Sequence, residues 1–206
     1  MRDATFQFPT ANDVVAMLSK GRPVNAADLF AIVTDELDGL ISGVRRDGLD
    51  PIEQFWNVDP HGKPNGTSRP EETCRNSVAL LLRERLGKYG VSCEAEARHA
   101  GKKRSDIWCP YENHGIPIEV KKQSHRELWT ALQNQLVSLY SSDTCAGGYG
   151  IYLVLWFGSD GLKPPPTGKK PKTAQALQAR LEEQVGAAQK SFIAVRVIDV
   201  SLRMSG

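Results

Sequence analysis

The run GIYLVLWF, at residues 150–157, is apolar along its whole length. A strand with one solvated face alternates apolar and polar residues, whereas a strand covered on both faces reads as a continuous apolar segment. Helices packed on both sides of a sheet provide that cover. The run therefore predicts a fully buried strand in an α/β sandwich.

The segments on either side of this run have the periodicity of helices and short strands. Carboxylates at Glu71 and Glu72 follow Pro70, which is typical of a helix start, and apolar residues continue that helix to Leu86. The other expected elements are strands at 91–97, 104–109 and 116–122, a helix at 125–140, a helix at 173–189 and a strand at 191–202. The predicted order is helix, three strands, helix, strand, helix and strand.

The first part of the chain is expected to be helical. Asn12 or Asp13 can cap a short helix, and Asn25 can cap a longer one whose apolar residues follow helical spacing as far as Ile41. Residues 57–70 contain three prolines and two glycines, which predicts a linker. We therefore expect a helical N-terminal extension with its linker at residues 1–66 and a second domain at residues 67–206.

Composition indicates an ordinary globular protein. The 206 residues carry a formal net charge of +2, and 40% are hydrophobic. No apolar run approaches the roughly 20 residues needed to cross a bilayer, and Met1 is not followed by a secretory signal, so we expect a cytoplasmic protein without membrane contact. The four cysteines form no C-x-x-C pair, and we interpret them as reduced thiols rather than as zinc ligands or disulfides.

The segment Ile116–Lys122 carries the chemistry of interest. Its side chains alternate, so Glu119 and Lys121 share one face of the expected strand. Asp106 lies on the preceding strand candidate, and a turn between the two strands would place it beside Glu119. Two carboxylates that close repel unless a cation lies between them, and Mg²⁺ is the natural one. Lys121 would then orient the attacking water or stabilise charge on a phosphate, whereas the alternative is a plain solvent-facing ion pair.

Two further positions each have more than one possible role. Gln135 interrupts an apolar helical stripe and needs a partner, which is either a metal-bound water or carboxylate, or the local backbone. Near the start of the helix at residue 70, either Glu71 or Glu72 can face the same site. The alternative for both glutamates is that they only charge the N-terminus of the helix.

Basic residues flank the proposed site along the chain. The expected phosphate contacts are Lys102, Lys103, Arg104, Lys122, His125 and Arg126. Such contacts position a nucleic acid without reading its sequence. The alternative for each run is an ordinary solvated loop or helix start.

These residues together resemble a known nuclease superfamily. Glu71, Ser105-Asp106, Ile118-Glu119-Val120-Lys121, Gln135-Leu136 and Tyr140 resemble the PD-(D/E)XK nucleases. The resemblance implies the restriction-endonuclease-like fold, an α/β fold with a mixed central sheet flanked by helices and an αβββαβ core. It also implies that Asp106 and Glu119 are metal ligands, that Lys121 is the catalytic lysine, and that Glu71 and Gln135 are accessory. Ser105 departs from the proline of the motif's name, and Tyr140 is one residue further from Gln135 than in Q-x-x-x-Y.

The predicted function is a Mg²⁺-dependent phosphodiesterase, with Mn²⁺ as a substitute, that acts on DNA as an endonuclease. The resemblance implies an effector of a bacterial defence, restriction or repair system. A second copy of the chain, or a sensor subunit on the N-terminal helices, is the expected partner besides DNA. The alternative is a catalytically silent nucleic-acid-binding or assembly module of the same fold.

Overall fold

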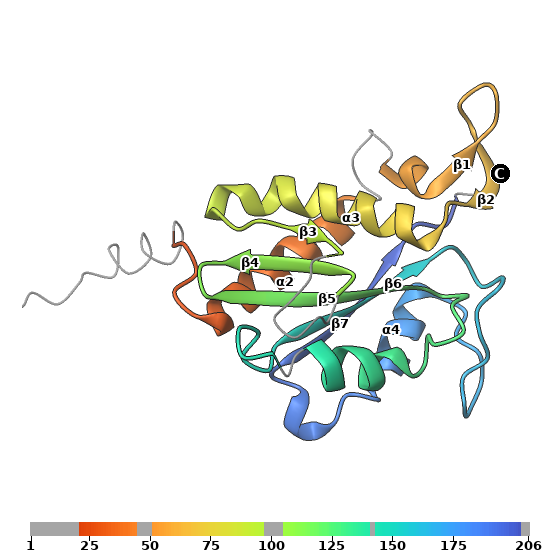
Figure 1. Cartoon of the computed structure of the whole chain (residues 1–206). Coiled ribbons are helices and arrows are strands. Elements are labelled where there is room, and N and C mark those ends of the chain that lie inside the picture. Colours follow the sequence, from red (N-terminus) through yellow and green to blue (C-terminus); the bar gives the residue numbers. More distant parts are fainter. Residues whose placement is uncertain (1–20, 45–50, 97–104, 141–142, 203–206) are drawn as a thin grey trace, which may run out of the picture.

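The computed structural model describes residues 21–44, 51–96, 105–140 and 143–202, and they form a mixed α/β structure (Figure 1). The short helix expected after Asn12 lies outside these residues. A five-stranded sheet runs through the middle, with helices on both of its faces. The predicted order of helix, three strands, helix, strand, helix and strand is confirmed.

The sheet is part antiparallel and part parallel. Its strands lie in the order β3 (Glu94–Ala95), β4 (Ile107–Tyr111), β5 (His114–Lys122), β6 (Gly150–Trp156) and β7 (Ile193–Asp199). β4 pairs antiparallel with β3 and β5, whereas β6 pairs parallel with β5 and β7. Every residue of β6 is buried, as its apolar sequence predicted.

One face of the sheet is covered by α2 (Ala26–Gly43) and α3 (Glu71–Leu86). Asn25 caps α2, because its side chain accepts a hydrogen bond from the backbone N–H of Asp28 at 2.9 Å. Buried residues of both helices join the inward side chains of β5 in one core. Since α2 belongs to that core, it is more than a peripheral extension, and the division at residues 66 and 67 stays a prediction.

The other face is covered by η3 (Leu132–Tyr140) and α4 (Ala174–Glu182). Their leucines pack against Tyr152 and Val154 of β6 in a second buried cluster. The helix predicted at 125–140 is present but starts later and is of another type, because residues 126–130 form turns and η3 is a π-helix. The helix expected at 173–189 is also shorter, ending at Glu182 before turns and the 3₁₀-helix η4 (Ala187–Gln189).

The linker predicted at residues 57–70 is wrong. After the 3₁₀-helix η1 (Pro51–Phe55), β1 (Trp56–Val58) and β2 (Pro64–Ser68) form an antiparallel hairpin that projects from the body (Figure 1). The Asp59 carboxylate accepts hydrogen bonds from the N–H groups of His61 and Lys63, each at 2.9 Å. The prolines and glycines therefore belong to a structured turn and an exposed two-stranded arm.

The strand expected at 91–97 is reduced to β3, and the chain between α3 and β3 passes through η2 (Gly87–Tyr89). Among the described residues, no helix is both long and apolar enough to cross a membrane. The four cysteines are free thiols.

Candidate functional site

The β4–β5 hairpin places two carboxylates side by side. Ile107 pairs with Ile118, so Asp106 lies opposite Glu119 one step further along the ladder. The Asp106 carboxylate also accepts a hydrogen bond from the backbone N–H of Val120 at 2.9 Å, which fixes its position. The adjacency predicted from the sequence is therefore present in the structure.

The tight turn of this hairpin depends on local sequence. Tyr111 pairs with His114, and Glu112 between them has a left-handed φ of 50°. Gly115, which follows His114, lies under the indole of Trp108, where an added Cβ would be 2.0 Å from a ring carbon. This close approach explains a glycine at a buried strand position.

Side-chain alternation along β5 separates the core from the site. Ile118 and Val120 point into the core beneath α2 and α3, whereas Glu119 and Lys121 point to the opposite face. Glu119 is 2% exposed and Lys121 is 6% exposed. The alternative of a plain solvent-facing ion pair is therefore wrong.

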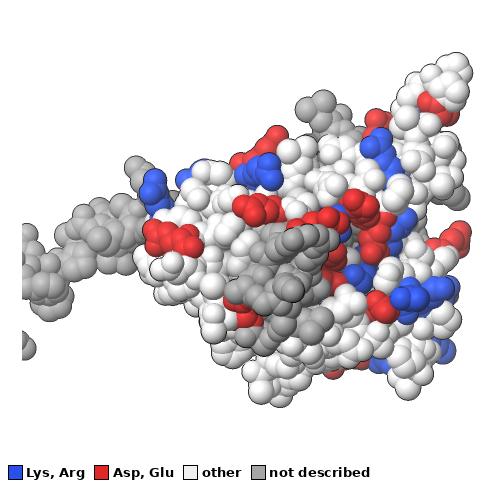
Figure 2. Space-filling model, viewed as in Figure 1, with Lys and Arg blue, Asp and Glu red and all other residues white. Residues whose placement is uncertain are grey.

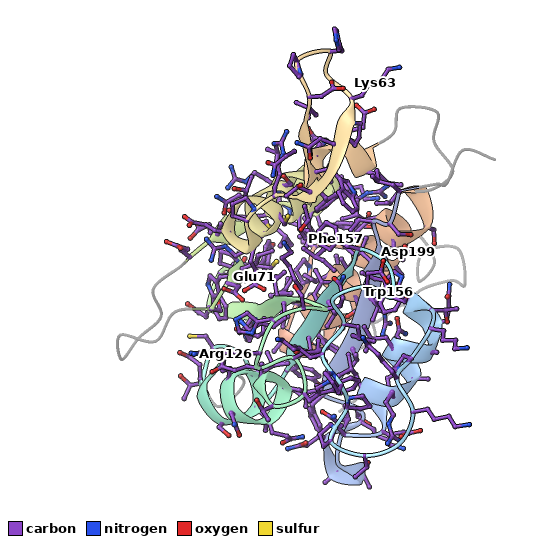
Figure 3. The ribbon with its side chains drawn as sticks, turned by 90° about the vertical axis from the view of Figure 1, so that its right-hand side faces the viewer. Lys63, Glu71, Arg126, Trp156, Phe157 and Asp199 are labelled. Carbon is purple, nitrogen blue, oxygen red and sulfur yellow. The ribbon has the colours of Figure 1, made fainter. Side chains whose placement is uncertain are left out.

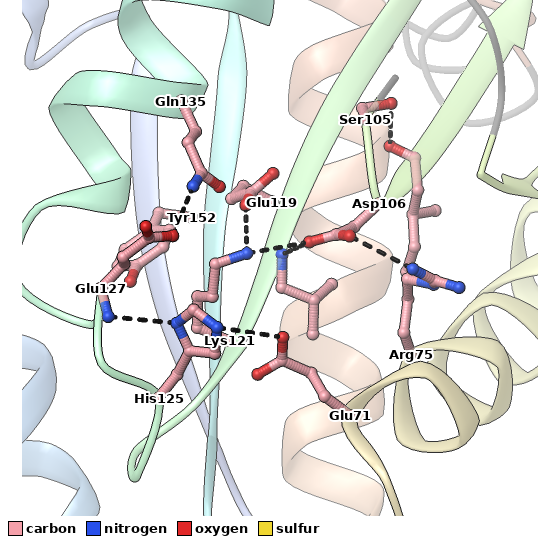
Figure 4. Close-up of polar contacts among 12 residues, drawn as sticks. Glu71, Arg75, Ser105, Asp106, Glu119, Lys121, His125, Glu127, Gln135 and Tyr152 are labelled. Atoms are coloured by element: carbon pink, nitrogen blue, oxygen red, sulfur yellow. Dashed lines mark hydrogen bonds and ion pairs between the residues drawn. The ribbon is translucent and has the colours of Figure 1, made fainter.

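The Lys121 ammonium lies between the two carboxylates (Figure 4). Its Nζ forms a short hydrogen bond to Glu119 and lies 3.5 Å from Asp106 Oδ2. Burial raises the pKa of the Glu119 carboxyl to about 7, the charge of Asp106 adds to that rise, and Lys121 opposes it. Burial alone would lower the pKa of Lys121, but the two carboxylates outweigh it and leave that pKa above its ordinary value.

Arg75 is a site residue that the sequence analysis missed. It comes from α3, one turn after Glu71, and its Nη1 lies 3.3 Å from Asp106 Oδ1. Its Nη2 donates to Glu96 at 2.8 Å. The Arg75 side chain is 10% exposed, and its Nε is buried with no hydrogen-bond partner among the described residues. The i, i+4 spacing from Glu71 was a signal that could have identified it.

Glu71, and not Glu72, faces the site. Glu71 Oε2 accepts a hydrogen bond from the backbone N–H of Lys122 at 2.8 Å, and Oε1 lies 3.9 Å from His125 Nε2. The side chain of Glu72 is 72% exposed. Glu71 therefore joins the start of α3 to the end of β5.

This difference between neighbouring glutamates leads to a prediction. Replacing Glu71 by alanine leaves the N–H of Lys122 without its charged acceptor, which we expect to cost about 1–3 kcal/mol of unfolding free energy. Glu72→Ala is the matched control and is expected to cost less than about 0.5 kcal/mol. Urea denaturation of both variants measures the difference, and equal losses would contradict the assigned role of Glu71.

Gln135 has a carboxylate partner. Its Nε2 donates to Glu127 Oε2 at 2.9 Å, and the N–H of Glu127 donates to His125 Nδ1 at 3.1 Å. Glu127, which the sequence analysis did not single out, thus joins Gln135 to His125 beside the carboxylate pair (Figure 4). The backbone alternative for this amide nitrogen is excluded by that contact. The side chain of Tyr140 lies outside the described residues.

The expected phosphate-contacting residues differ in their positions. Lys102, Lys103 and Arg104 lie outside the described residues. The ammonium of Lys122 donates to Ser68 Oγ at 2.6 Å, so it is turned toward the β1–β2 hairpin. The side chain of Arg126 is 84% exposed. In Figure 2 acidic and basic side chains lie close together beside the grey residues, so the described part of this face has no single sign of charge.

The donor set is suited to a hard cation. Asp106 and Glu119 offer carboxylate oxygens, which Mg²⁺ prefers, and Mg²⁺ keeps several waters rather than requiring a full protein cage. Among the described ranges there is no group of three or more His, Cys, Asp or Glu side chains arranged to hold a metal. Burial and, after it, the charge of Asp106 raise the pKa of Glu119, and a bound cation would counter both effects. Asp106 and Glu119 are therefore the residues that could hold a magnesium ion here.

Comparison with known proteins identifies a family for this chain. Neither the curated proteins nor the solved structures contain a match to this chain. The segment at residues 49–159 spans the β1–β2 hairpin, α3, β3 to β6 and every described site residue named above. This segment matches the family model described as "Domain of unknown function (DUF8371)". Because it covers more than half of the chain, the chain belongs to that family.

Proposed function

We propose that this protein is a metal-dependent nuclease of the PD-(D/E)XK kind that hydrolyses phosphodiester bonds in DNA. The observation that carries the proposal is the arrangement of Asp106, Glu119 and Lys121. Two carboxylates lie opposite each other on paired strands, and a buried ammonium two residues further along β5 contacts both. Perturbed ionisable groups of this kind concentrate at functional sites.

The topology supports the same proposal. The order α3, β3, β4, β5, η3, β6, with an antiparallel first half and a parallel β5–β6 pair, agrees with the αβββαβ core of the restriction-endonuclease-like fold. Fold alone does not assign an activity. The proposed activity therefore depends on the site residues at the end of β5.

In the proposed reaction, Asp106 and Glu119 hold Mg²⁺, or Mn²⁺ in its place. The metal would supply an activated water and neutralise charge on the phosphate. Asp106 is oriented for this role by the N–H of Val120 and by Arg75. Because Glu119 lies deeper than Asp106, whose side chain is 22% exposed, the substrate phosphate approaches from the Asp106 side.

Lys121 would donate hydrogen bonds from its ammonium to the attacking water, which orients it, or to a phosphate oxygen. Burial opposes the charge on Lys121, but Glu119 and Asp106 outweigh it and leave the pKa of Lys121 raised, so the ammonium stays charged. A buried charged donor stabilises negative charge that develops on the phosphate. Glu71 fixes the chain directly after Lys121 through the N–H of Lys122. Gln135 acts through Glu127 and His125 as a positioning residue.

The substrate and setting are part of the same proposal. Exposed Arg126 beside the site is available for a backbone phosphate. We propose internal cleavage of DNA, in a defence, restriction or repair system, by a protein that works as a homodimer or with a sensor subunit. Cutting both strands of a duplex in one binding event takes two such sites, which favours the homodimer.

A second candidate is a catalytically silent nucleic-acid-binding or assembly module. One observation favours it: Lys121 and Arg75 already neutralise both carboxylates from within the chain. A site of this kind is stable without any metal. The two candidates differ in whether Mg²⁺ binds and whether DNA is cut.

The deciding experiment combines cleavage with thermal unfolding. We expect the wild-type protein to nick and linearise supercoiled DNA with Mg²⁺ or Mn²⁺, and EDTA to stop the reaction. The metal should also raise the unfolding temperature by mass action, and Asp106→Asn should lose both effects. DNA binding without products, together with an unchanged unfolding temperature, would support the silent module instead.

A further inference from the structure

The β1–β2 hairpin extends into solvent beside the candidate site. No residue from Asn57 to Ser68 is buried, so the part of this two-stranded sheet beyond Trp56 is not packed into the core. Figures 1 and 3 show the hairpin rising from the body, with Lys63 near its far end. An isolated hairpin in water is marginally stable at best, so the base must stabilise this arm.

The base of the hairpin is anchored in the core. Trp56 is 6% exposed, and its indole N–H donates to the carbonyl of Val200 at 2.8 Å. The same ring meets Phe157 edge-on, with centroids 5.1 Å apart. The side-chain Nε of Arg69 donates to the carbonyl of Trp56 at 2.8 Å, and the backbone N–H of Arg69 donates to the carbonyl of Phe55 at 2.9 Å. The arm therefore has a fixed origin and a fixed direction.

One residue joins this base to the site. The backbone N–H of Lys122 donates to Glu71, and its ammonium donates to Ser68 Oγ and to the carbonyl of Arg69 at 3.0 Å. Lys122 directly follows Lys121. In Figure 3, Glu71 lies between Lys63 on one side and Arg126 on the other. A long polymer bound across Glu71 would meet both.

The surface of the arm is polar. Its exposed or half-exposed side chains include Asn57, His61, Lys63, Asn65 and Thr67, and the large exposed apolar residue is Val58, at 44%. A protein-docking surface concentrates aromatic and aliphatic anchors at its centre, which this arm lacks.

We propose that the β1–β2 hairpin enters a groove of a DNA duplex whose backbone lies at Asp106 and Glu119. This inference depends on the proposed function and names the double-stranded form as the substrate. A two-stranded ribbon fits the major groove, which is about 12 Å wide and about 8.5 Å deep. The five residues of β2 span roughly 17 Å at about 3.4 Å per residue, so the arm can reach the floor of the groove.

The arm fits the groove in size, and its side chains are also of the kinds that contact base edges. Asparagine amides pair with adenine in the major groove, and threonine methyl and hydroxyl groups also contact base edges. Asn65 Oδ1 accepts a hydrogen bond from the backbone N–H of Thr67 at 2.9 Å. This bond fixes the amide, and the NH₂ group of the same amide does not take part in it. The Asp59 carboxylate is bound to the turn's own N–H groups. Lys63 adds a positive charge at the far end.

The test compares duplex and single-stranded DNA of one sequence. In the first variant an Asn-Gly turn replaces residues 58–66, which keeps Trp56, Ser68 and Arg69 at the base. We expect cleavage of the duplex to fall at least tenfold while cleavage of the single strand stays within twofold of wild type. Lys63→Glu should weaken duplex binding severalfold. Lys190→Glu, an equal charge change just before β7, should not.

Duplex binding measured without metal keeps this test separate from catalysis. Loss of duplex affinity in the shortened variant and in Lys63→Glu supports the inference even if the wild type cuts no DNA, which would overturn the nuclease proposal alone. Wild-type duplex affinity in both variants overturns the groove assignment and points to a protein partner for the arm. Absence of duplex binding by the wild type also overturns it. If the shortened variant fails to fold, Lys63→Glu and Asn65→Ala decide the question.

Discussion

Replacing Lys121 by methionine is expected to reduce DNA cleavage by about 10³-fold while metal binding persists. The ammonium of Lys121 contacts both Asp106 and Glu119, and it is the buried cation nearest to the proposed reacting centre. Methionine fills a similar volume without charge, so the packing around this buried position changes little. Both proposed metal ligands, Asp106 and Glu119, remain in this variant. Single-turnover cleavage with Mg²⁺ measures the loss.

Thermal unfolding with and without Mg²⁺ separates the role of Lys121 from that of the ligands. Without the ammonium, the two carboxylates repel more strongly, so we expect Lys121→Met to gain more stability from Mg²⁺ than the wild type does. Glu119→Gln should instead lose that gain. Lys190→Met serves as the control for removing a lysine elsewhere. If Lys121→Met cut DNA within tenfold of wild type while Asp106→Asn was inactive, Lys121 would not be catalytic.

Replacing Gly115 by alanine is expected to destabilise the protein by roughly 3 kcal/mol or more. An added Cβ would lie 2.0 Å from one ring carbon of Trp108 and 2.4 Å from another, so the indole would have to leave its position. Because Trp108 and Gly115 belong to the hairpin that carries Asp106 and Glu119, cleavage should fall together with stability. Urea unfolding measures the loss.

A double-mutant cycle identifies the cause of that loss. In a Trp108→Ala background the clashing ring is absent, so Gly115→Ala should cost less than about 1 kcal/mol. Gly87→Ala is the control glycine, because nothing lies within 4 Å of its added Cβ. An equal cost of Gly115→Ala in both backgrounds would show that the backbone, and not the indole, requires glycine.

The central part of the site follows from local sequence rules. Strand alternation places Glu119 and Lys121 on one face of β5. A short hairpin places Asp106 opposite Glu119, so their separation of thirteen residues was enough to predict that the two carboxylates lie side by side. The buried strand at 150–157 was equally predictable, because a short and continuous apolar run is typical of a strand that is covered on both faces.

The features that were missed depend on long-range contacts. Local pattern allows either Glu71 or Glu72 to face the site, and the contact of Glu71 with the N–H of Lys122, 51 residues away, decides between them. Prolines and glycines at 57–70 predict turns but not the buried Trp56 that anchors a hairpin between them. Lys122 looks like a free cation in sequence, yet Ser68 binds it. A leucine spacing that suits an α-helix also suits the π-helix η3.

The uniform burial of β6 has a consequence for dividing this protein. The family match ends at residue 159, shortly after β6, whereas β7 pairs with β6 along its whole length and α4 covers the same side. A fragment cut at the limits of the match would turn β6 into an edge strand with apolar side chains on both faces. Open strand edges of that kind recruit other chains and aggregate. The smallest piece that keeps this sheet covered is thus longer than the segment that defines the family.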